Sequence, residues 1–167
     1  KIGVLLSSDK AVHPVNTYGA SKLLAEKLWL NGGVYGAPRR RVSVVRYGNI
    51  RGSRGSLLER AKQEDFRLRH PDATRFWLNQ EAAVELVFKA ISEGVGSEIL
   101  VPKITSSRLG DLFPGAPVGD GVERGEKLHE RLVSEEEVGR TWDCGGHFVI
   151  ADEQPVGGVR VPSSFEY

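Results

Sequence analysis

The chain has 167 residues, with 23 Lys and Arg against 22 Asp and Glu, so its formal net charge is +1. This near balance removes the electrostatic basis for a dedicated nucleic-acid binder, and we expect no nucleic-acid partner. No apolar stretch approaches the ~20 residues that cross a bilayer, so we expect no membrane segment within the chain. The single cysteine, Cys144, excludes an internal disulfide and favours a reducing, cytoplasmic setting.

The start of the chain has an unusual composition. It begins on Lys1, directly before a run that is typical of a strand, and the whole sequence contains no Met. Domains seldom begin inside a buried strand, so we expect the chain to be a piece of a longer protein. Its length suits one domain with a small annex.

The first 47 residues predict a strand, a helix and a second strand. Ile2–Leu6 is a continuous apolar run, which is typical of a central strand covered on both faces. Asn16 or Thr17 can cap a helix that runs to about Leu30, where Asn31-Gly32-Gly33 would end it. The β-branched run Arg41–Tyr47 follows as a strand. This order and spacing predict a right-handed βαβ unit with parallel strands.

The rest of the chain continues the alternation with a weaker pattern. In order, we expect a polar helix, a short strand, a strong helix and a third strand, over Leu57–Arg67, Thr74–Leu78, Glu81–Ser92 and Glu98–Val101. Beyond them we expect a helical turn or two over Ser107–Phe113, partial helices over Glu126–Leu132 and Ser134–Arg140, and a last strand over Phe148–Ala151. Ser134 and Glu137 have the spacing of a capping box.

Two neighbouring groups of residues could carry chemistry. Tyr18 and Lys22 are four residues apart and share one helix face. A tyrosine hydroxyl ordinarily ionises near pH 10, and a nearby ammonium favours the phenolate that can act as a base. Ser8-Asp9-Lys10 stands at the carboxyl end of the first strand, the edge where ligands bind in open α/β sheets. Either group alone is more simply read as solvated surface, but their proximity favours an active site.

Residues 5–22 (LLSSDKAVHPVNTYGASK), which contain both groups, resemble the extended short-chain dehydrogenase/reductase superfamily. Within it they are most similar to nucleotide-sugar 4,6-dehydratases of polysaccharide biosynthesis, of the inverting UDP-N-acetylglucosamine type. Further similar segments follow in family order: 44–49 (VVRYGN), 52–56 (GSRGS), 74–78 (TRFWL), 83–87 (AVELV), 101–104 (VPKI) and 125–130 (GEKLHE).

The resemblance implies an α/β fold that contains the C-terminal strands and helices of a Rossmann-type parallel sheet, with a small mixed α/β substrate-binding part. Residues 1–50 would be the second half of the NAD(P)-binding domain and carry the catalytic motif. Residues 81–102 would add a Rossmann helix and strand. Residues 51–80 and 103–167 would form the substrate-binding part.

The same resemblance implies a role for each residue of the two groups. Tyr18 would take the proton from the sugar O4 while hydride leaves C4 for NAD or NADP, and Lys22 would hold the cofactor ribose. Lys10 would be the base at C5, and Asp9 the acid that protonates the departing 6-hydroxyl. Ser8 would hydrogen-bond O4. The product would be a 4-keto-6-deoxy sugar nucleotide.

Further contacts are implied for the cofactor and the substrate. Tyr18, Lys22, Tyr47, Gly48 and Asn49 would bind the cofactor, with Gly48 allowing a close backbone approach. The implied substrate contacts are Asn49, Arg54, Arg75, Lys103, Arg124 and Glu126, with Lys127 as a further anion contact. A guanidinium between glycines, as at Arg54, suits a pyrophosphate, although each basic residue is as readily a surface charge.

The sequence also departs from the resembled pattern. No Gly-x-Gly-x-x-Gly turn follows a strand, so we expect the chain alone to have little or no turnover. Glu123 and Arg124 stand where the family usually has Arg and Pro. The four histidines have no i, i+4 pairing and no carboxylate-rich cluster in the sequence, so we predict no metal site.

Three alternatives remain open at this point. The chain could be a fragment of a nucleotide-sugar 4-epimerase, which does not need Asp9 and Lys10 for elimination. It could be a catalytically silent module that binds sugar nucleotides, or an unstable truncated product with an exposed sheet edge. For the dehydratase, the implied partners are a UDP-sugar substrate and further copies of the parent protein in a homo-oligomer.

Overall fold

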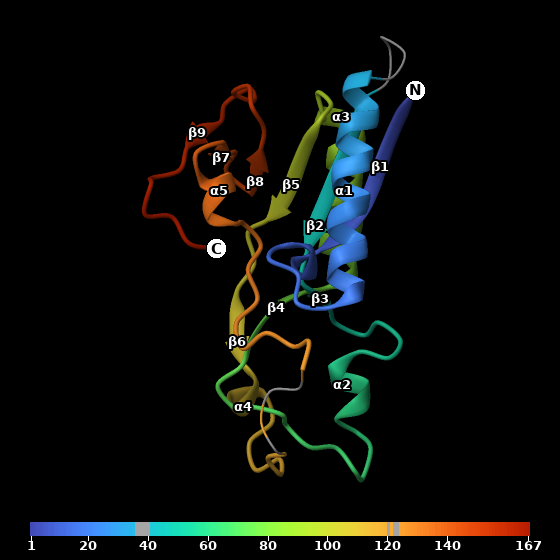
Figure 1. Cartoon of the computed structure of the whole chain (residues 1–167), viewed down its shortest axis with the longest axis vertical. Coiled ribbons are helices and arrows are strands. Elements are labelled where there is room, and N and C mark those ends of the chain that lie inside the picture. Colours follow the sequence, from blue (N-terminus) through green and yellow to red (C-terminus); the bar gives the residue numbers. More distant parts are fainter. Residues whose placement is uncertain (36–40, 120, 122–123) are drawn as a thin grey trace.

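Helices and strands alternate along the first two thirds of the chain, and short strands dominate the last third (Figure 1). The computed structural model describes residues 1–35, 41–119, 121 and 124–167. The elements are β1 (Ile2–Ser8), the 3₁₀ turn η1 (Asp9–Ala11), α1 (Thr17–Tyr35), β2 (Arg41–Tyr47), β3 (Asn49–Ile50), α2 (Leu57–Arg60), β4 (Thr74–Leu78), α3 (Gln80–Glu93), β5 (Glu98–Pro102), β6 (Ser106–Arg108), α4 (Leu109–Leu112), α5 (Glu135–Val138), β7 (Thr141–Asp143), β8 (His147–Ile150) and β9 (Val159–Arg160).

Within the described residues the strands form two sheets. The larger has six strands in the order β1-β2-β5-β8-β7-β9, and the smaller has three in the order β3-β4-β6. β1, β2 and β5 are parallel, which confirms the predicted βαβ unit. β8 runs antiparallel to β5, and β7 and β9 extend the sheet in the same manner. Neither this antiparallel extension nor β3, β6, β7 and β9 was predicted from the sequence.

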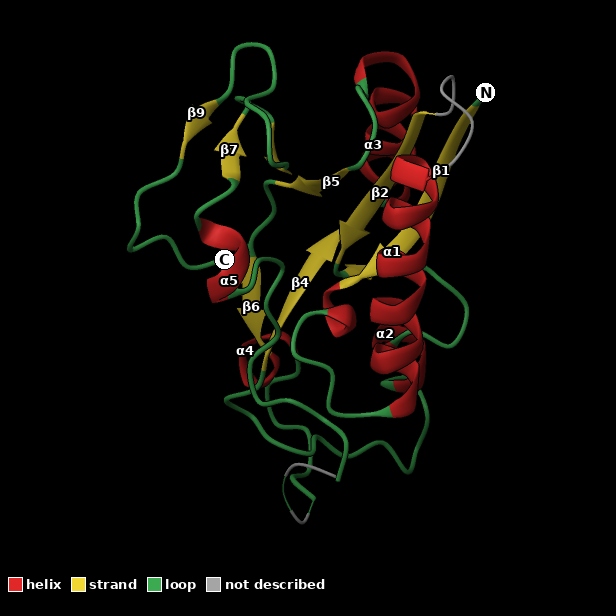
Figure 2. Ribbon diagram, turned by 45° about the horizontal axis from the view of Figure 1, so that its top comes forward, coloured by secondary structure: helices red, strands yellow, loops and turns green. Residues whose placement is uncertain are grey.

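Two helices cover opposite faces of the larger sheet (Figure 2). Val44 and Val45 are neighbours on β2, so their side chains point to opposite faces, and both are 0% exposed. Val44 belongs to a cluster against which Leu30 of α1 packs, whereas Val45 packs with Leu86 and Ala90 of α3. A strand buried on both faces explains why its sequence is an almost continuous β-branched run.

Arg46 departs from the apolar pattern of β2, because it is a charged residue whose guanidinium is buried. Nη2 lies 2.6 Å from Oε2 of Glu26 on α1, and Nη1 lies 2.8 Å from Oε2 of Glu137 on α5. Nη1 also donates to the carbonyl of Leu132 at 3.0 Å. This buried ion cluster ties α1 and α5 to the sheet.

Several predicted element boundaries are wrong. α1 continues through Gly32 to Tyr35, because Gly32 takes a helical rather than a left-handed conformation. The helix predicted over 57–67 ends at Arg60. The segment predicted as helical over 126–132 instead runs beside β4, where Thr74 N donates to Leu128 O. Ser106–Arg108 likewise pairs with β4 as β6, which leaves a single helical turn, α4.

An aromatic cluster joins the two sheets near the end of the chain. Phe76 of β4 and Phe148 of β8 both pack on the Tyr167 ring, with centroids 5.2 and 5.1 Å away. The Tyr167 hydroxyl lies 2.6 Å from Ile104 O. The backbone carbonyl of Tyr167 accepts from Leu132 N and Val133 N at 2.8 Å each. The last residue of the chain therefore packs between the sheets.

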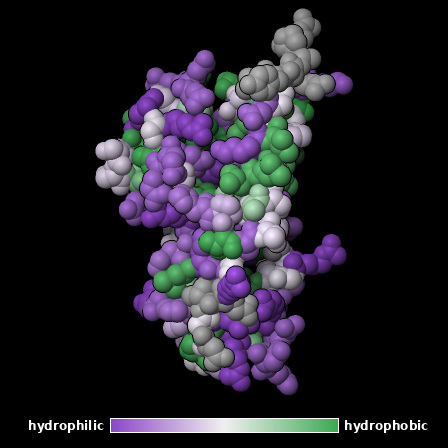
Figure 3. Space-filling model, in the orientation of Figure 1, coloured by the Kyte–Doolittle hydropathy of each residue, from purple (hydrophilic) through white to green (hydrophobic). Residues whose placement is uncertain are grey.

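The surface over α1 carries apolar side chains that the core does not use (Figure 3). Leu24 and Leu28 of α1 are 60% and 63% exposed. None of the helices among the described residues is long and apolar enough to cross a membrane.

Candidate functional site

A cleft of about 640 Å³ opens where β1 and β2 end. One side is built from the carboxyl ends of these two parallel strands and the start of α1, and the other from residues 53–75 and 125–130. Parallel strands place their carboxyl ends at one edge, which is where open α/β sheets bind ligands. Most of the residues singled out from the sequence line this cleft: Ser8, Lys10, Tyr18, Lys22, Tyr47, Gly48, Asn49, Arg54, Arg75 and Glu126. Asp9, Lys103 and Arg124 do not.

Tyr18 and Lys22 are positioned by the start of α1. The Asn16 side chain accepts a hydrogen bond from Gly19 N at 2.8 Å and caps the helix. Lys22 Nζ donates to Leu6 O of β1 at 3.2 Å and lies 5.8 Å from the centroid of the Tyr18 ring. Tyr18 itself is 52% exposed. The helix therefore presents a phenol at the cleft with an ammonium anchored beside it.

Ser8, Asp9 and Lys10 form a hydrogen-bonded group at the end of β1. Asp9 Oδ1 accepts from Ser8 Oγ at 2.7 Å and from Lys10 Nζ at 3.1 Å. The Asp9 side chain is 0% exposed, whereas that of Lys10 is 30% exposed. Oδ2 of Asp9 is buried without a hydrogen-bond partner among the described residues. The amine thus faces the cleft, and the carboxylate lies behind it.

The segment after β2 packs closely on β4. Burial raises the pKa of the Tyr47 hydroxyl, and the neighbouring Tyr18 phenol raises it further. A Cβ at Gly48 would lie 2.5 Å from Cβ of Phe76, so glycine is required here by β4 as well as suited to a ligand. Asn49 Nδ2 donates to Phe76 O at 3.2 Å. Tyr18 is therefore close enough to Tyr47 to affect the pKa of the Tyr47 hydroxyl.

The far side of the cleft is rich in arginine. Arg54 is exposed in a turn between Gly52 and Gly55, whose φ angles are 78° and 70°. Arg75 Nη1 donates to Thr74 O at 2.8 Å and Leu128 O at 3.1 Å, which fixes the side chain. Sequence reasoning missed the other basic side chains that line this wall, namely Arg60, Arg67, Arg69 and His70. Helical spacing would have placed Arg60 and Arg67 on one face, but Arg69 and His70 lie beyond the predicted helix, and nothing in the local pattern directed them to this wall.

Two predicted substrate contacts lie away from the cleft. Lys103 Nζ is 2.7 Å from Oδ1 of Asp143 and 4.9 Å from the centroid of the Phe148 ring. Its hydrogen bond lowers the pKa of the Asp143 carboxyl. Arg124 is exposed, and Glu123 lies outside the described residues. Lys103 is therefore engaged by β7 and β8, just after the end of β5.

Lys127 and Glu130 complete the cleft on the side of β1. Lys127 Nζ lies 2.6 Å from Oε2 of Glu130 and donates to Val12 O at 2.7 Å. Lys127 was expected to contact an anionic ligand, but a carboxylate and backbone carbonyls of the chain already engage its ammonium. Glu130 was not singled out from the sequence, because its cationic neighbours come from distant segments.

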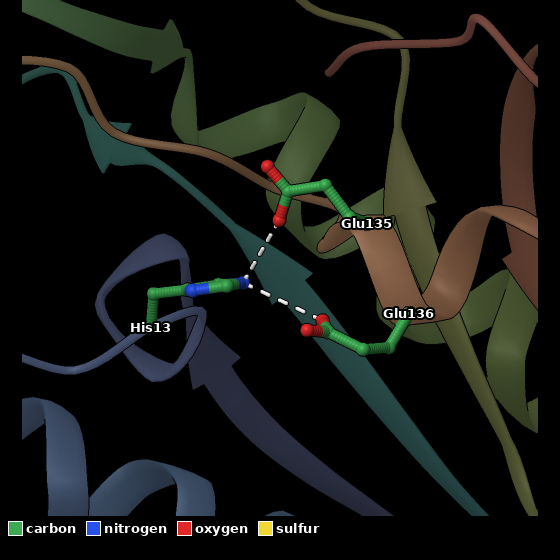
Figure 4. A group of neighbouring side chains, drawn as sticks. All are labelled: His13, Glu135 and Glu136. Carbon is green, nitrogen blue, oxygen red and sulfur yellow. Dashed lines mark ion pairs between the residues drawn. The ribbon is translucent and has the colours of Figure 1, made fainter.

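A further group joins one histidine to two carboxylates. Nε2 of His13 lies 3.2 Å from Oε2 of Glu135 and 3.5 Å from Oε2 of Glu136 (Figure 4). The sequence showed no such cluster, since these residues are far apart along the chain. All three are exposed, and Arg131 pairs with Glu135. The group is therefore a surface contact between the loop before α1 and the start of α5.

Comparison with known proteins gives one family and several relatives. The profile of the family described as "Polysaccharide biosynthesis protein" matches residues 1–152. A UDP-N-acetylglucosamine 4,6-dehydratase (inverting) of Campylobacter jejuni is 35% identical over 89% of this chain and 48% of its own length. An uncharacterized membrane protein of Methanocaldococcus jannaschii is 38% identical over 88% of this chain and 51% of its own length. A UDP-glucose 4-epimerase of Rickettsia typhi is 34% identical over 88% of this chain and 48% of its own length. The chain spans about half the length of these curated relatives.

Solved structures share the fold. Pen from Bacillus thuringiensis superposes with a TM-score of 0.82 at 28% identity, over 90% of this chain and 52% of that protein. MoeE5, solved with UDP-glucuronic acid and NAD, superposes with a TM-score of 0.64 at 17% identity. The match covers 77% of this chain and 54% of MoeE5. The predicted Rossmann-type α/β class is therefore confirmed.

Proposed function

Because the chain belongs to the polysaccharide biosynthesis protein family, we propose that it supplies the sugar-nucleotide site and the acid–base residues of an NAD(P)-dependent nucleotide-sugar 4,6-dehydratase. One observation supports this most strongly. Tyr18, Lys22 and Lys10 come from two elements and line a single cleft at the carboxyl edge of the parallel strands.

The proposed substrate is a UDP-N-acetylhexosamine, which would be converted to its 4-keto-6-deoxy form. The relatives named UDP-N-acetylglucosamine 4,6-dehydratase support this choice of sugar nucleotide. The arginine-rich wall suits the diphosphate, because guanidinium groups form strong charge-assisted hydrogen bonds with phosphate oxygens. Arg54 and Arg75 are the contacts we propose first, with Asn49 and Glu126 toward the sugar.

The nicotinamide cofactor would supply hydride transfer at the sugar C4 and C6. The exposed Tyr18 phenol, the anchored Lys22 ammonium and the Tyr47–Asn49 segment fit its nicotinamide and ribose end. A phosphate-binding glycine turn is not found in this sequence, so the pyrophosphate end has no equivalent site here. We therefore propose that the chain holds only one end of the cofactor.

The chain's own residues would move the protons. Tyr18 takes the proton from the sugar O4, and Ser8 hydrogen-bonds the same oxygen. Once C4 is a ketone, the C5 proton is acidic, and Lys10 removes it. The 6-hydroxyl leaves as water, which requires that its oxygen take up one proton. Lys10, now an ammonium, would donate that proton, and the Asp9 carboxylate, 3.1 Å behind it, would act through Lys10 rather than by touching the sugar.

Two measurements test this function. Calorimetry on the chain should show binding of UDP-N-acetylglucosamine that Arg54→Gln weakens. Incubation of the chain alone with this substrate and NADP⁺ should give little or no 4-keto product, whereas the complete gene product should form it. The proposal is wrong if the chain does not bind this substrate and the complete gene product does not turn it over. Rapid turnover by the chain alone would show that the chain holds more than one end of the cofactor.

A 4-epimerase is the second candidate, since relatives with that name are almost as similar. An epimerase needs no base at C5. Retention of the C5 proton during turnover in deuterated water would favour the epimerase, whereas its exchange, lost in Lys10→Ala, favours the dehydratase. A silent binding module would bind the nucleotide sugar without either reaction.

The remaining expectations are part of the same proposal. They are the division of the chain into 1–50, 51–80, 81–102 and 103–167, a homo-oligomeric parent protein and a cytoplasmic location. Cys144, the single cysteine, is a free thiol, which is compatible with a reducing compartment.

A further inference from the structure

Lys10 lies between two buried carboxylates. Its Nζ is 3.1 Å from Oδ1 of Asp9 and 4.0 Å from Oε1 of Glu130. The side chains of Asp9 and Glu130 are 0% and 4% exposed, whereas that of Lys10 is 30% exposed. Lys10 is therefore the one member of this group that solvent and a ligand can readily reach.

Lys127 holds Glu130 in place. Its Nζ lies 2.6 Å from Oε2 of Glu130, 2.7 Å from Val12 O and 3.4 Å from Asp9 O. The two carbonyls accept hydrogen bonds from this ammonium, and the Glu130 carboxylate forms an ion pair with it. Both carbonyls belong to the turn that carries Lys10. Lys127 therefore fastens the segment bearing Glu130 to that turn.

We infer that Glu130 is a positioning residue for Lys10, and that it stabilises the ammonium which forms when Lys10 accepts a proton. This role rests on the proposed function, in which Lys10 is the base at the sugar C5. Asp9 and Glu130 balance Lys10 and Lys127 in charge only while both amines are protonated. In a poorly solvated site, that balance favours proton uptake by Lys10.

The other titratable groups at this end of the cleft do not take over this role. Tyr18, Lys22 and Tyr47 line the same region. In the described part of the chain, none of them forms a hydrogen bond or ion pair with Lys10. Glu130 and Asp9 are thus the charges that act on this amine directly, and Glu130 is the one supplied by a distant segment.

Competitive acetylation of the chain with N-acetoxysuccinimide, followed by peptide mass spectrometry, tests the inference without turnover. Only neutral amines react, so the rate at each lysine reports its deprotonated fraction. Removing one opposite charge within 4–6 Å should raise the labelling of Lys10 at least ~10-fold in Glu130→Gln, relative to the exposed Lys27. Glu130→Asp keeps the charge and should restore much of the slow rate. Glu85→Gln, an exposed control on α3, should change nothing.

Lys127→Gln gives a prediction of opposite sign. It leaves the Glu130 charge without its cation, so labelling of Lys10 should fall below that of the parent chain. Unchanged Lys10 labelling in a folded Glu130→Gln chain would overturn the inference. If the Glu130→Gln chain unfolds, the labelling of every lysine will accelerate together. In that case, faster labelling of Lys10 in a folded Lys127→Gln chain would overturn the inference.

The proposed dehydratase function and the proposed role of Glu130 can each be contradicted without the other. In the complete gene product, Glu130→Gln should move the pH profile of substrate C5 exchange to lower pH and lower its high-pH plateau, because Lys10 then loses its proton more readily but is a weaker base, and Glu130→Asp should rescue part of both changes. If the parent enzyme shows no C5 exchange at all while the labelling results hold, the proposed function is wrong and the control of Lys10 by Glu130 stands. If C5 exchange is normal in Glu130→Gln, the positioning role is wrong.

Discussion

Arg46 and Glu137 are 91 residues apart in the sequence, yet Nη1 of Arg46 donates to Oε2 of Glu137 at 2.8 Å inside the protein. Glu26 binds the same guanidinium from α1. Three charged side chains are thus buried together, and each depends on the others for compensation. Because α1 also carries Tyr18, this cluster connects the stability of the fold to the geometry of the cleft.

Replacing Arg46 by Met should destabilise the chain by about 3–5 kcal/mol, because it leaves two buried carboxylates without a cation. Urea denaturation measures the change. The control is Lys89→Ala, which removes an exposed i, i+4 pair with Glu93 at 3.7 Å and should cost no more than about 1 kcal/mol. Equal effects of the two substitutions would show that the buried cluster contributes nothing special.

The stability of the chain should fall in acid through Glu137. Burial acts to raise the pKa of this carboxyl, but the hydrogen bonds and charge of Arg46 outweigh burial and hold the pKa below its ordinary value of 4.5. A carboxyl whose pKa is lower in the folded state stabilises the fold above pH 4.5, and that contribution is lost as the pH falls through the folded-state pKa. Denaturation at a series of pH values should show this loss, and Glu137→Gln should flatten it. An equally steep decline in the variant would assign the effect to other groups.

Two glycines of α1 should respond to alanine in opposite directions. A Cβ at Gly19 would lie 2.3 Å from the carbonyl oxygen of Lys10, so Gly19→Ala must push the helix away from η1 and should destabilise by about 1–3 kcal/mol. A Cβ at Gly32 would meet no atom within 4 Å, so Gly32→Ala should stabilise by about 0.5–1 kcal/mol through helix propensity. Thermal unfolding compares them. Stabilisation by both would mean that α1 and η1 are not in close contact.

Tyr18→Phe should reduce turnover of the complete gene product by about 10²–10⁴-fold while leaving its unfolding temperature unchanged. The substitution removes only the hydroxyl of a side chain that is 52% exposed, so packing is little affected. Lys27→Gln, at an exposed position of the same helix, serves as the control and should retain full activity. Activity within twofold of the parent would remove Tyr18 from the proposed mechanism.

Features set by local spacing were predictable from the sequence. Tyr18 and Lys22 lie together because four residues make about one helical turn, and the capping box was recognised because it needs only Ser134 and Glu137, whose contact the structure confirms at 3.0 Å. The parallel pairing of the first two strands followed from the helix between them. Each of these depends on a few consecutive residues.

Features set by distant partners were not predictable. Arg46 sits in a strand pattern that gives no sign of buried carboxylates, because Glu26 and Glu137 come from two separate helices. Glu130 belongs to a segment expected to be helical, but its backbone neighbours pair with β4 instead. Arg69 and His70 line the cleft from the loop that follows α2, a placement that no local pattern predicts. In each case tertiary contacts outweigh local propensity.

The aromatic cluster around Tyr167 has a mechanical consequence. The chain passes between the two sheets at Gly48, after Leu78, after Pro102 and again between β6 and β7, and Tyr167 packs on one ring from each sheet. A rotation that widened the cleft would have to bend all of these connections and separate the rings at the same moment. Neither sheet is a contiguous piece of sequence that could be cut out and expressed by itself. We therefore expect any change in access to the cleft to come from its rim loops rather than from a rotation of one sheet against the other.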